Sequence, residues 1–592
     1  MIDLEKSLLE KQPGLEEVPG SRLLFKMLKK LFREDEINKF IKTNQHLRGF
    51  AFLDKILEYF DFTYQASARS LNKIPAEGRI IIVANHPIGS LDGLALLKMI
   101  RSIRPDVRIV ANELLNRVEP LQSLFLPIEI MSSRKATYKS QYKAMLNVLE
   151  KDEALIIFPA GEVSRIKPHG VRDGTWKRGF LKLAKHTRSP ILPILVDAKN
   201  SALFYSMSTV FKPLGTAMLV REMFNKENQE LQFHIGNAIP WSELENSDLN
   251  NKQLAKLFRK QLYWLAKRKK KSLFNTVETI VHPSRRKALK QELYKSKLLG
   301  ETPDGKKIFL YDYVSDSPVI HEIGRLRELT FRTVEEGTGK VTDIDHHDTY
   351  YRHLVLWDEA DLEIVGAYRI GECKKIIQEK GEEGLYTSTL FNFESTLIDD
   401  CLPGAIELGR SFVQPRYWGK RSLDYLWFGI GAYLRQHPEI KYLFGPVSLS
   451  QSYSNQSKDI ILAFYQQQFG SDKSMAKAKK PYKISYENKK LAALEFSGDY
   501  KESYRKMNKM LKKMGVKVPT LYKQYSELCD DKGCQFIAFN IDPNFNNCID
   551  SLILVDLDRI KAQKKYRYIG EITNTSDEEF PIATLLDQNE KK

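Results

Sequence analysis

Short apolar runs alternate with amphipathic stretches between residues 61 and 250. The apolar runs predict strands, and they read GRIIIVANH from residue 78, VRIVAN from 107, ALIIFPAG from 154, SPILPILVDA from 189 and ELQFHIG from 230. Residues 91–100, 137–150 and 175–188 have a helical spacing of apolar side chains. Strands that alternate with helices predict an α/β domain.

A second set of apolar runs follows after residue 300. Strands are predicted at 362–370, 405–413, 441–449, 534–542 and 551–557, and helices at 421–436 and 500–514. Residues 1–60 look helical, with a break at Pro19-Gly20. The pattern therefore predicts four parts, which are a helical region at 1–60, a first α/β domain at 61–274, a basic linker at 275–299 and a second α/β (α+β) domain with a C-terminal accessory part at 300–592.

Charge adds a constraint on partners. The 592 residues carry a formal net charge of +17, which favours an anionic partner such as a membrane face, an acidic protein or a phosphate-bearing substrate. Residues 251–274 hold nine Lys or Arg and no acid, with apolar side chains at helical spacing, and residues 21–32 have a similar pattern. These segments predict basic helices at an anionic membrane surface, or ordinary surface helices packed on their own domain. We expect no spanning helix, no secretory signal and no nucleic-acid partner, because no 18-residue apolar window, h-region or nucleic-acid-binding motif occurs.

A histidine and an aspartate flank the turn after the first strand. His86 follows the apolar run, and Asp92 opens the next helical stretch. A carboxylate that holds an imidazole in one tautomer makes it a general base, which can take the proton of a substrate hydroxyl. A structural pair is the alternative.

The surroundings of this pair resemble the lysophospholipid and glycerol-phosphate acyltransferases. That family has four residues between the histidine and the aspartate, whereas five separate His86 from Asp92. Phe158-Pro159-Ala160-Gly161 resembles the family's second block, Lys177-Arg178-Gly179-Phe180 its Lys-x-Gly helix start, and Pro190–Ile194 its late apolar strand. The resemblance implies that Glu162 and Arg165 bind the polar head of the acyl acceptor.

A basic turn in the second half predicts an anion site. Glu407-Leu408-Gly409-Arg410 lies in a predicted strand, and Arg416-Tyr417-Trp418-Gly419-Lys420-Arg421 precedes a helix, whose N-terminal N–H groups attract phosphate. The turn resembles the pyrophosphate-binding loop of GNAT-type N-acyltransferases. That resemblance implies that Arg410, Arg416, Gly419, Lys420 and Arg421 bind the phosphopantetheine arm of an acyl carrier protein, or coenzyme A.

The motifs EGTGK, IVGAYRIG, ELGRSFV and LFGPVSLS, which start at residues 336, 364, 407 and 443, further resemble the ornithine N-acyltransferases and the acyl-homoserine-lactone synthases. Direct transfer to an amine needs a group that takes the amine's proton. We expect Glu407 to do this or to bind the amine, with a structural ion pair to Arg410 or another cation as the alternative.

Asp343, Asp345 and Asp348 surround His346 and His347. A solvated loop and a metal site are the alternatives for this cluster, and the function that we favour for Asp343 and Asp345 is a pocket for a cationic amino acid. The chemistry requires no metal and no bound cofactor.

Together these resemblances imply a bifunctional ornithine lipid synthase. The second half would N-acylate ornithine from acyl-ACP, and the first half would O-acylate the lyso-lipid, with His86 as base and Asp92 as its partner. We expect a cytoplasmic enzyme, peripheral on the inner face of the membrane. Two alternatives stay open, namely a glycerolipid acyltransferase fused to an N-acyltransferase for another amino acid such as glycine, and a non-catalytic basic membrane-binding protein or haemolysin.

Overall fold

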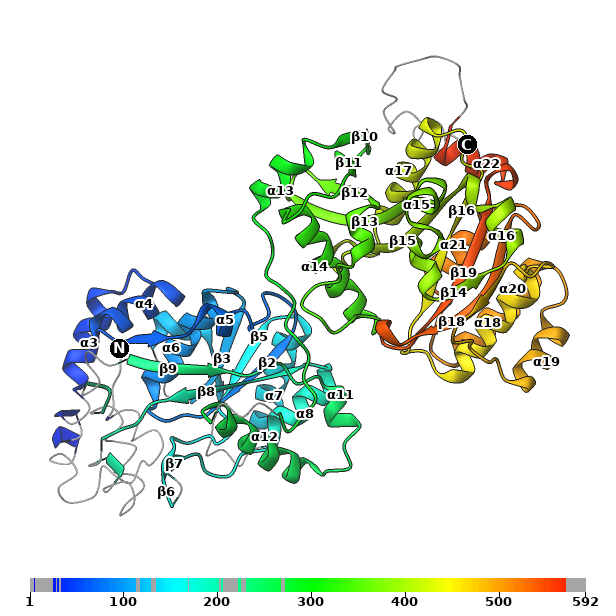
Figure 1. The fold of residues 1–592 in the computed structure, drawn as a ribbon. Helices are drawn as coiled ribbons and strands as arrows, with labels where there is room; N and C mark the ends of the chain where they lie inside the picture. Colours follow the sequence, from blue (N-terminus) through cyan, green and yellow to red (C-terminus); the bar gives the residue numbers. More distant parts are fainter. Residues whose placement is uncertain are drawn as a thin grey trace. The chain divides into compact units, whose positions relative to one another are not determined.

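The structure is a computed structural model that divides into two compact units (Figure 1). It describes residues 5, 25–27, 29–30 and 33–570, without 113–117, 129–134, 169, 202–203, 206–221, 225–229 and 268–271. Unit 1 is Met1–His282 and unit 2 is Pro283–Lys592, so the division falls inside the predicted linker. That segment contains helix α13 (Arg286–Leu293) and the first residues of strand β10 (Lys297–Glu301).

Unit 1 is built on a seven-stranded sheet with the order β1-β9-β8-β2-β5-β3-β4. Every neighbouring pair is parallel except β8 and β9. The five predicted strands are confirmed, and β1 and β4 are additional short strands at the edges. The strands are β1 (Thr63–Gln65), β2 (Ile80–Ala84), β3 (Val107–Asn112), β4 (Phe125–Ile128), β5 (Ala154–Ile157), β8 (Ile191–Asp197) and β9 (Glu230–Ile235).

Helices cover both faces of this sheet, which explains why β2 is apolar throughout. Ile80 and Ile82 join one core, and Ile81 and Val83 join the other. The first core is closed by helices α4 (Gly49–Tyr59) and α6 (Ser90–Arg101), and the second by α7 (Lys135–Glu150), α8 (Gly179–Thr187) and α12 (Asn251–Leu265) (Figure 1).

The basic helix predicted at 251–274 is α12, and its apolar face is not free. Leu254, Phe258 and Leu262 are fully buried in the core of unit 1, and the ring of Phe258 packs edge-on against Phe180 of α8. The surface helix packed on its own domain is therefore the correct alternative for this face, and insertion of the face into a membrane is excluded. The other basic stretch, 21–32, lies mostly outside the described residues. Among the residues that the structure describes, no helix has the length and apolar character needed to cross a membrane.

Unit 2 is built on an eight-stranded sheet with the order β10-β11-β12-β13-β15-β16-β19-β18. All neighbours are antiparallel except β15 and β16, which are parallel. The predicted strands at 405–413 and 534–542 have the observed bounds, whereas the first three strands of the sheet, β10 to β12, were not predicted. The remaining strands are β11 (Lys306–Tyr311), β12 (Arg352–Asp358), β13 (Glu363–Glu372), β15 (Ala405–Val413), β16 (Tyr442–Leu449), β18 (Cys534–Asp542) and β19 (Cys548–Asp556).

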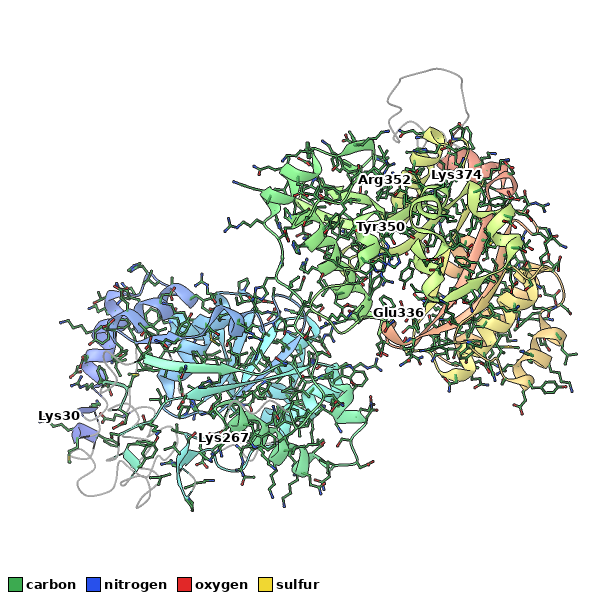
Figure 2. All side chains as sticks on the ribbon, viewed as in Figure 1. Lys30, Lys267, Glu336, Tyr350, Arg352 and Lys374 are labelled. Carbon is green, nitrogen blue, oxygen red and sulfur yellow. The ribbon has the colours of Figure 1, made fainter. Side chains whose placement is uncertain are left out.

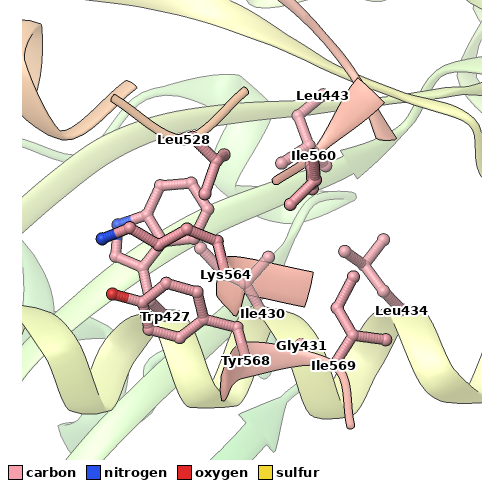
Figure 3. Close-up of a pocket in the computed structure, with 10 residues that line it drawn as sticks. All are labelled: Trp427, Ile430, Gly431, Leu434, Leu443, Leu528, Ile560, Lys564, Tyr568 and Ile569. Atoms are coloured by element: carbon pink, nitrogen blue, oxygen red, sulfur yellow. The ribbon is translucent and has the colours of Figure 1, made fainter. Parts of the chain in front are cut away.

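Helix α17 (Ser422–Gln436) is the buried helix that the sequence predicts, and the end of the described chain packs on it. A Cβ atom on Gly431 would lie 1.8 Å from the carbonyl oxygen of Tyr568, so this contact requires glycine. Beside it lies a small apolar pocket between α17, β16 and residues 528–569 (Figure 3). The close contact shows that helix α22 (Ala562–Tyr568) is an integral part of unit 2.

Candidate functional site

The first candidate site lies at the turn between β2 and α6. The Nδ1 atom of His86 is 3.0 Å from Oδ1 of Asp92. The His86 side chain is 21% exposed and the Asp92 side chain is fully buried. The carboxylate thus supports the imidazole from inside, and part of the ring stays accessible to a substrate.

Backbone N–H groups hold Asp92 in this position. Ile88 N–H donates to Oδ2 over 2.9 Å and Gly89 N–H to the same atom over 3.3 Å, while Gly93 N–H donates to Oδ1 over 2.8 Å. Gly89 has a φ of +111°, which residues with a side chain rarely adopt. The glycine turn therefore accommodates the fifth residue between His86 and Asp92.

Burial lowers the pKa of His86, but the charge and hydrogen bond of Asp92 and the charge of Asp173 together outweigh burial, and the net pKa is raised above its usual value. A second carboxylate, Asp173, adds to this effect from the backbone side of His86. A raised pKa makes the imidazole a better proton acceptor once it is neutral.

The loop after β5 is attached directly to His86. Ser164 N–H donates to the carbonyl oxygen of His86 over 2.8 Å, and the Phe158 ring stacks on the imidazole with centroids 4.1 Å apart. Asp173 accepts a hydrogen bond from the Ser164 hydroxyl over 2.6 Å and another from the Trp176 indole N–H over 2.8 Å. The sequence analysis missed Asp173, because no motif singles out an aspartate in the loop between the two recognised blocks.

Glu162 and Arg165, the predicted headgroup ligands, lie on either side of Ser164 on this loop. Glu162 rests against Gly174, where an added Cβ would be 2.8 Å from its Oε1 atom. The Arg165 guanidinium lies 5.7 Å from the centroid of the Phe204 ring, and its Nη1 atom is buried without a hydrogen-bond partner among the residues that the structure describes. The structure thus places both on the loop that His86 anchors, and their role in binding stays a prediction.

The second candidate site lies where β15 and β16 separate. The two strands pair in parallel only over Ala405–Glu407 and Tyr442–Phe444, yet β15 runs on to Val413 and β16 to Leu449. Gly445, just after the paired segment, still lies close against β15, since a Cβ on it would be 2.0 Å from the carbonyl oxygen of Leu408. Beyond this point β15 stays paired with β13, and β16 with β19, but the two strands no longer pair with each other.

Glu407 lies at the end of the paired segment and is 1% exposed. It accepts hydrogen bonds from Thr387 N–H over 2.7 Å, from Tyr386 N–H over 3.1 Å and from the Tyr351 hydroxyl. Both carboxylate oxygens are therefore engaged in holding the turn at Tyr386–Thr389 (η6). This argues against Glu407 as a free proton acceptor, and it is not joined to Arg410 by an ion pair among the described residues.

Asp343 and Asp345 do lie together, and they contact Arg410. The Arg410 guanidinium is 3.1 Å from Asp343 and 3.6 Å from Asp345, while Arg369 lies 2.7 Å from Asp345. Burial raises the pKa of Asp343, whereas hydrogen bonding and the two guanidinium groups outweigh burial and lower the pKa of Asp345 far below its usual range. Arg410 thus lies with Asp343 and Asp345, the predicted amino-acid ligands, and its binding of the carrier arm stays a prediction.

The other predicted carrier-binding residues form the turn before α17. Gly419 has a φ of +75°, and Lys420 Nζ lies 4.9 Å from the centroid of the Tyr417 ring. Arg416 is half exposed and pairs with Asp361 and Glu363 at 2.8 and 2.7 Å. Arg421 lies 3.7 Å from Asp424. The basic turn is at the start of a helix as predicted, and its contact with an acyl carrier stays a prediction.

Three buried carboxylates near Arg410 were missed by the sequence analysis. Glu336, which is labelled in Figure 2, is 7% exposed, Asp542 is 3% exposed and Asp550 is 5% exposed. Asp542 ends the strand predicted at 534–542, Asp550 directly precedes the strand predicted at 551–557, and Glu336 sits in a recognised motif. Only the tertiary fold shows that the charges of Asp542 and Glu336 act on Asp550.

Comparison with known proteins defines the class. The acyltransferase family matches residues 6–272 and the acetyltransferase (GNAT) domain matches residues 326–428. The protein is therefore an acyltransferase that combines one domain of each kind, one in each unit.

Individual relatives correspond to the two halves. A glycine N(alpha)-acyltransferase of Phocaeicola vulgatus is 33% identical over 321 residues, which cover 52% of this chain and 98% of that protein. A lyso-glycine lipid O-acyltransferase of the same organism is 28% identical over 254 residues, covering 42% of this chain and 89% of that protein. An L-ornithine N(alpha)-acyltransferase of Brucella abortus is 33% identical over 138 residues, covering 21% of this chain and 47% of that protein. The chain belongs to the family of these N-acyltransferases, because it spans nearly all of the first relative.

Proposed function

We propose that the chain makes an aminolipid by two successive acyl transfers. Unit 2 acylates the amino group of an amino acid, and unit 1 then esterifies the hydroxyl group of the resulting lyso-lipid. The observation that carries the proposal is the pair of relatives from one organism, an N-acyltransferase and a lyso-lipid O-acyltransferase, that the chain matches over 98% and 89% of their lengths.

Glycine is the first candidate for the amino acid. The glycine enzymes match this chain over nearly their whole length, whereas the Brucella ornithine enzyme matches over 47% of its length. Ornithine, which the sequence motifs favour, is the second candidate. The buried carboxylates of unit 2 support it, because ornithine carries a second ammonium group that needs a negative partner.

In unit 1, His86 takes the proton of the lyso-lipid hydroxyl while the oxygen attacks the thioester carbon of the acyl donor. Asp92 holds the imidazole and stabilises the imidazolium that forms. Glu162 and Arg165 face the polar head of the lyso-lipid. The imidazolium then supplies the proton to the departing thiolate, so that the base is regenerated.

The acyl donor is an acyl carrier protein or coenzyme A, and the enzyme works at the inner face of the cytoplasmic membrane as a peripheral protein. Carrier proteins and anionic lipids both suit the net charge of +17. Arg416, Lys420 and Arg421 meet the phosphate of the carrier arm. Since the apolar face of α12 is buried, contact with the membrane relies on its charged face rather than on insertion.

Lipid analysis of a bacterial host that expresses the chain tests the proposal. Cells are fed labelled glycine or labelled ornithine, and their lipids are analysed by mass spectrometry. The wild-type chain is expected to give the diacylated aminolipid of one label. His86→Ala is expected to accumulate the mono-acylated lipid, because only the second transfer is lost. Absence of any labelled N-acyl lipid from wild-type cells would refute the proposal, and full diacylation by His86→Ala would refute the role of His86.

A further inference from the structure

The carboxylate of Asp550 lies beyond the point at which β15 and β16 separate. Asp550 on β19 is directly opposite Ser448 on β16 and Asn540 on β18. Side chains of directly opposed residues share one face of the sheet. The Ser448 hydroxyl donates to Oε2 of Glu336 over 2.8 Å, so Glu336 and Asp550 are brought to the same place from distant parts of the chain.

Asp550 differs from Glu407 and Asp345 of unit 2 in having no donor. It is 5% exposed, and no hydrogen bond or ion pair to it occurs among the residues that the structure describes. Glu407 and Asp345, by contrast, are fully engaged. A buried carboxylate without a partner is costly for a protein, and such groups are kept where a ligand supplies the missing donors.

Arg410 on β15 is a cation whose charge acts on Asp550. Arg410 lies 4.7 Å from the centroid of the Tyr386 ring and 4.8 Å from that of Phe545, which is in the turn between β18 and β19. Its guanidinium donates to the Tyr386 hydroxyl over 2.9 Å. Arg410 on β15 and Asp550 on β19 are thus carried by strands on either side of β16 in the sheet order. An amino acid has a carboxylate and an amino group that need these two partners.

We propose that the Asp550–Glu336 pair binds the amino group of the acceptor amino acid and takes its proton. This proposal rests on the N-acyl transfer proposed for unit 2. It moves the proton acceptor from Glu407 to a pair of carboxylates of which one, Glu336, opens the EGTGK motif and the other, Asp550, lies outside every recognised motif. Glu407 is then a positioning residue, because its carboxylate accepts the backbone N–H groups of Tyr386 and Thr387 and so fixes the Tyr386–Thr389 turn.

The step balances without a co-reactant. The ammonium group enters and gives one proton to the carboxylate pair, which leaves a neutral amine with a free electron pair. The nitrogen attacks the thioester carbon, the C–N bond forms and the C–S bond breaks. The nitrogen loses its second proton, and the departing thiolate becomes the thiol of the carrier arm. The net products are the amide, the thiol and one proton released to water.

The electrostatic setting supports this role. Burial raises the pKa of Glu336 to about 7, and burial together with Asp542 and Glu336 raises the pKa of Asp550 above its usual range. A proton acceptor works best when its pKa is near the working pH, and coupled acids titrate as a pair. The other charged or titratable groups that face the pair are Arg410, Asp542, Tyr386, Tyr453, Tyr522 and Cys548.

The test uses the purified full chain with acyl carrier protein as donor and glycine or ornithine as acceptor, between pH 6.5 and 9.5. Thiol release and the N-acyl product are both measured. Asp550→Asn is expected to lower kcat/KM about 100-fold or more at pH 7, which is the usual size of a lost general base. The deficit should shrink about tenfold per pH unit as the free amine becomes abundant, and Glu336→Gln should show a smaller deficit with the same trend. Asp558→Asn, an exposed aspartate just beyond the same strand, is the matched control and should behave like wild type.

The outcomes separate the two proposals. If wild type forms an N-acyl product and Asp550→Asn and Glu336→Gln do so at its rate, or with a deficit that is the same at every pH, the carboxylate pair is not the proton acceptor. If wild type forms no N-acyl product from either amino acid, the proposed function of unit 2 fails, and this inference fails with it. Should Asp550→Asn not fold, as judged by circular dichroism, the pH dependence of Glu336→Gln decides.

Discussion

Glu336 provides a quantitative test of the electrostatics of unit 2, independent of catalysis. The perturbation is Glu336→Gln, which keeps the size of the side chain and an oxygen that can accept the Ser448 hydroxyl. It removes only the ability to ionise. Because burial holds the wild-type pKa at about 7, the glutamate is charged in the folded protein at pH 8 at a cost that glutamine does not have.

The magnitude follows from the pKa. The folded state holds the Glu336 proton up to about pH 7, whereas an unfolded glutamate releases it near 4.5. At Glu336 the folded state therefore binds more protons than the unfolded state in this window. The contribution of Glu336 to the free energy of unfolding falls as the pH rises from about 4.5 to 7, and above pH 7 this contribution stays constant. At about 1.4 kcal/mol per pH unit, the loss amounts to about 3 kcal/mol. Glu336→Gln should thus gain about 3 kcal/mol over wild type between pH 4 and pH 8.

Hydrogen exchange followed by mass spectrometry measures this change for unit 2 alone. Peptides from β16 and β19 are compared between variant and wild type at the same pH, so that the intrinsic exchange rates cancel. The protection ratio should be near one at pH 4 and about 100-fold at pH 8, provided that these strands exchange by unfolding of the unit. Glu301→Gln, at the exposed end of β10, serves as the matched control. A protection ratio that does not change with pH would refute the reasoning.

Three further substitutions have defined expectations. Asp92→Asn should lower the maximal rate of O-acyl transfer and move the acid limb of the pH–rate profile to lower pH. The reason is that the substitution removes a charge that raises the pKa of His86, and an unchanged acid limb would contradict this. Gly445→Ala should abolish N-acyl transfer, measured as carrier thiol release, while leaving O-acyl transfer intact, because its Cβ would lie 2.0 Å from the Leu408 carbonyl oxygen. Phe258→Ala should destabilise unit 1 by about 3–5 kcal/mol in urea unfolding, because this ring is fully buried; a loss of vesicle binding without loss of stability would contradict the packing described for α12.

The sequence predicted unit 1 well because its elements and its site are local. The central strands have apolar runs that both faces of the sheet require, and His86 and Asp92 lie on one strand–turn–helix segment. The site therefore follows from a motif. The sequence alone did not show that Asp173 lies behind His86, since that contact depends on how the loop after β5 folds back.

Unit 2 was predicted less completely, because its site is made by contacts between distant segments. The strand bounds at 405–413 and 534–542 were correct, but periodicity does not reveal which strands become neighbours. Arg410 was grouped with the basic turn because the two are near in sequence, whereas its partners are Asp343 and Asp345. Burial likewise decided between the two interpretations of α12, which amphipathic spacing alone left open.

The positions of the site residues along the chain decide which of the two sites can form first during synthesis. The His86–Asp92 contact forms within a short segment, and unit 1 ends at His282, so it can fold while the remaining chain is still being translated. The site of unit 2 is different, because Glu336 is hydrogen-bonded to Ser448, which is 112 residues later in the chain. Asp550, on β19, is synthesised last of the three. A ribosome-bound chain would thus complete the O-acylation site before the N-acylation site. The half that the proposed pathway uses second is the half that can fold first.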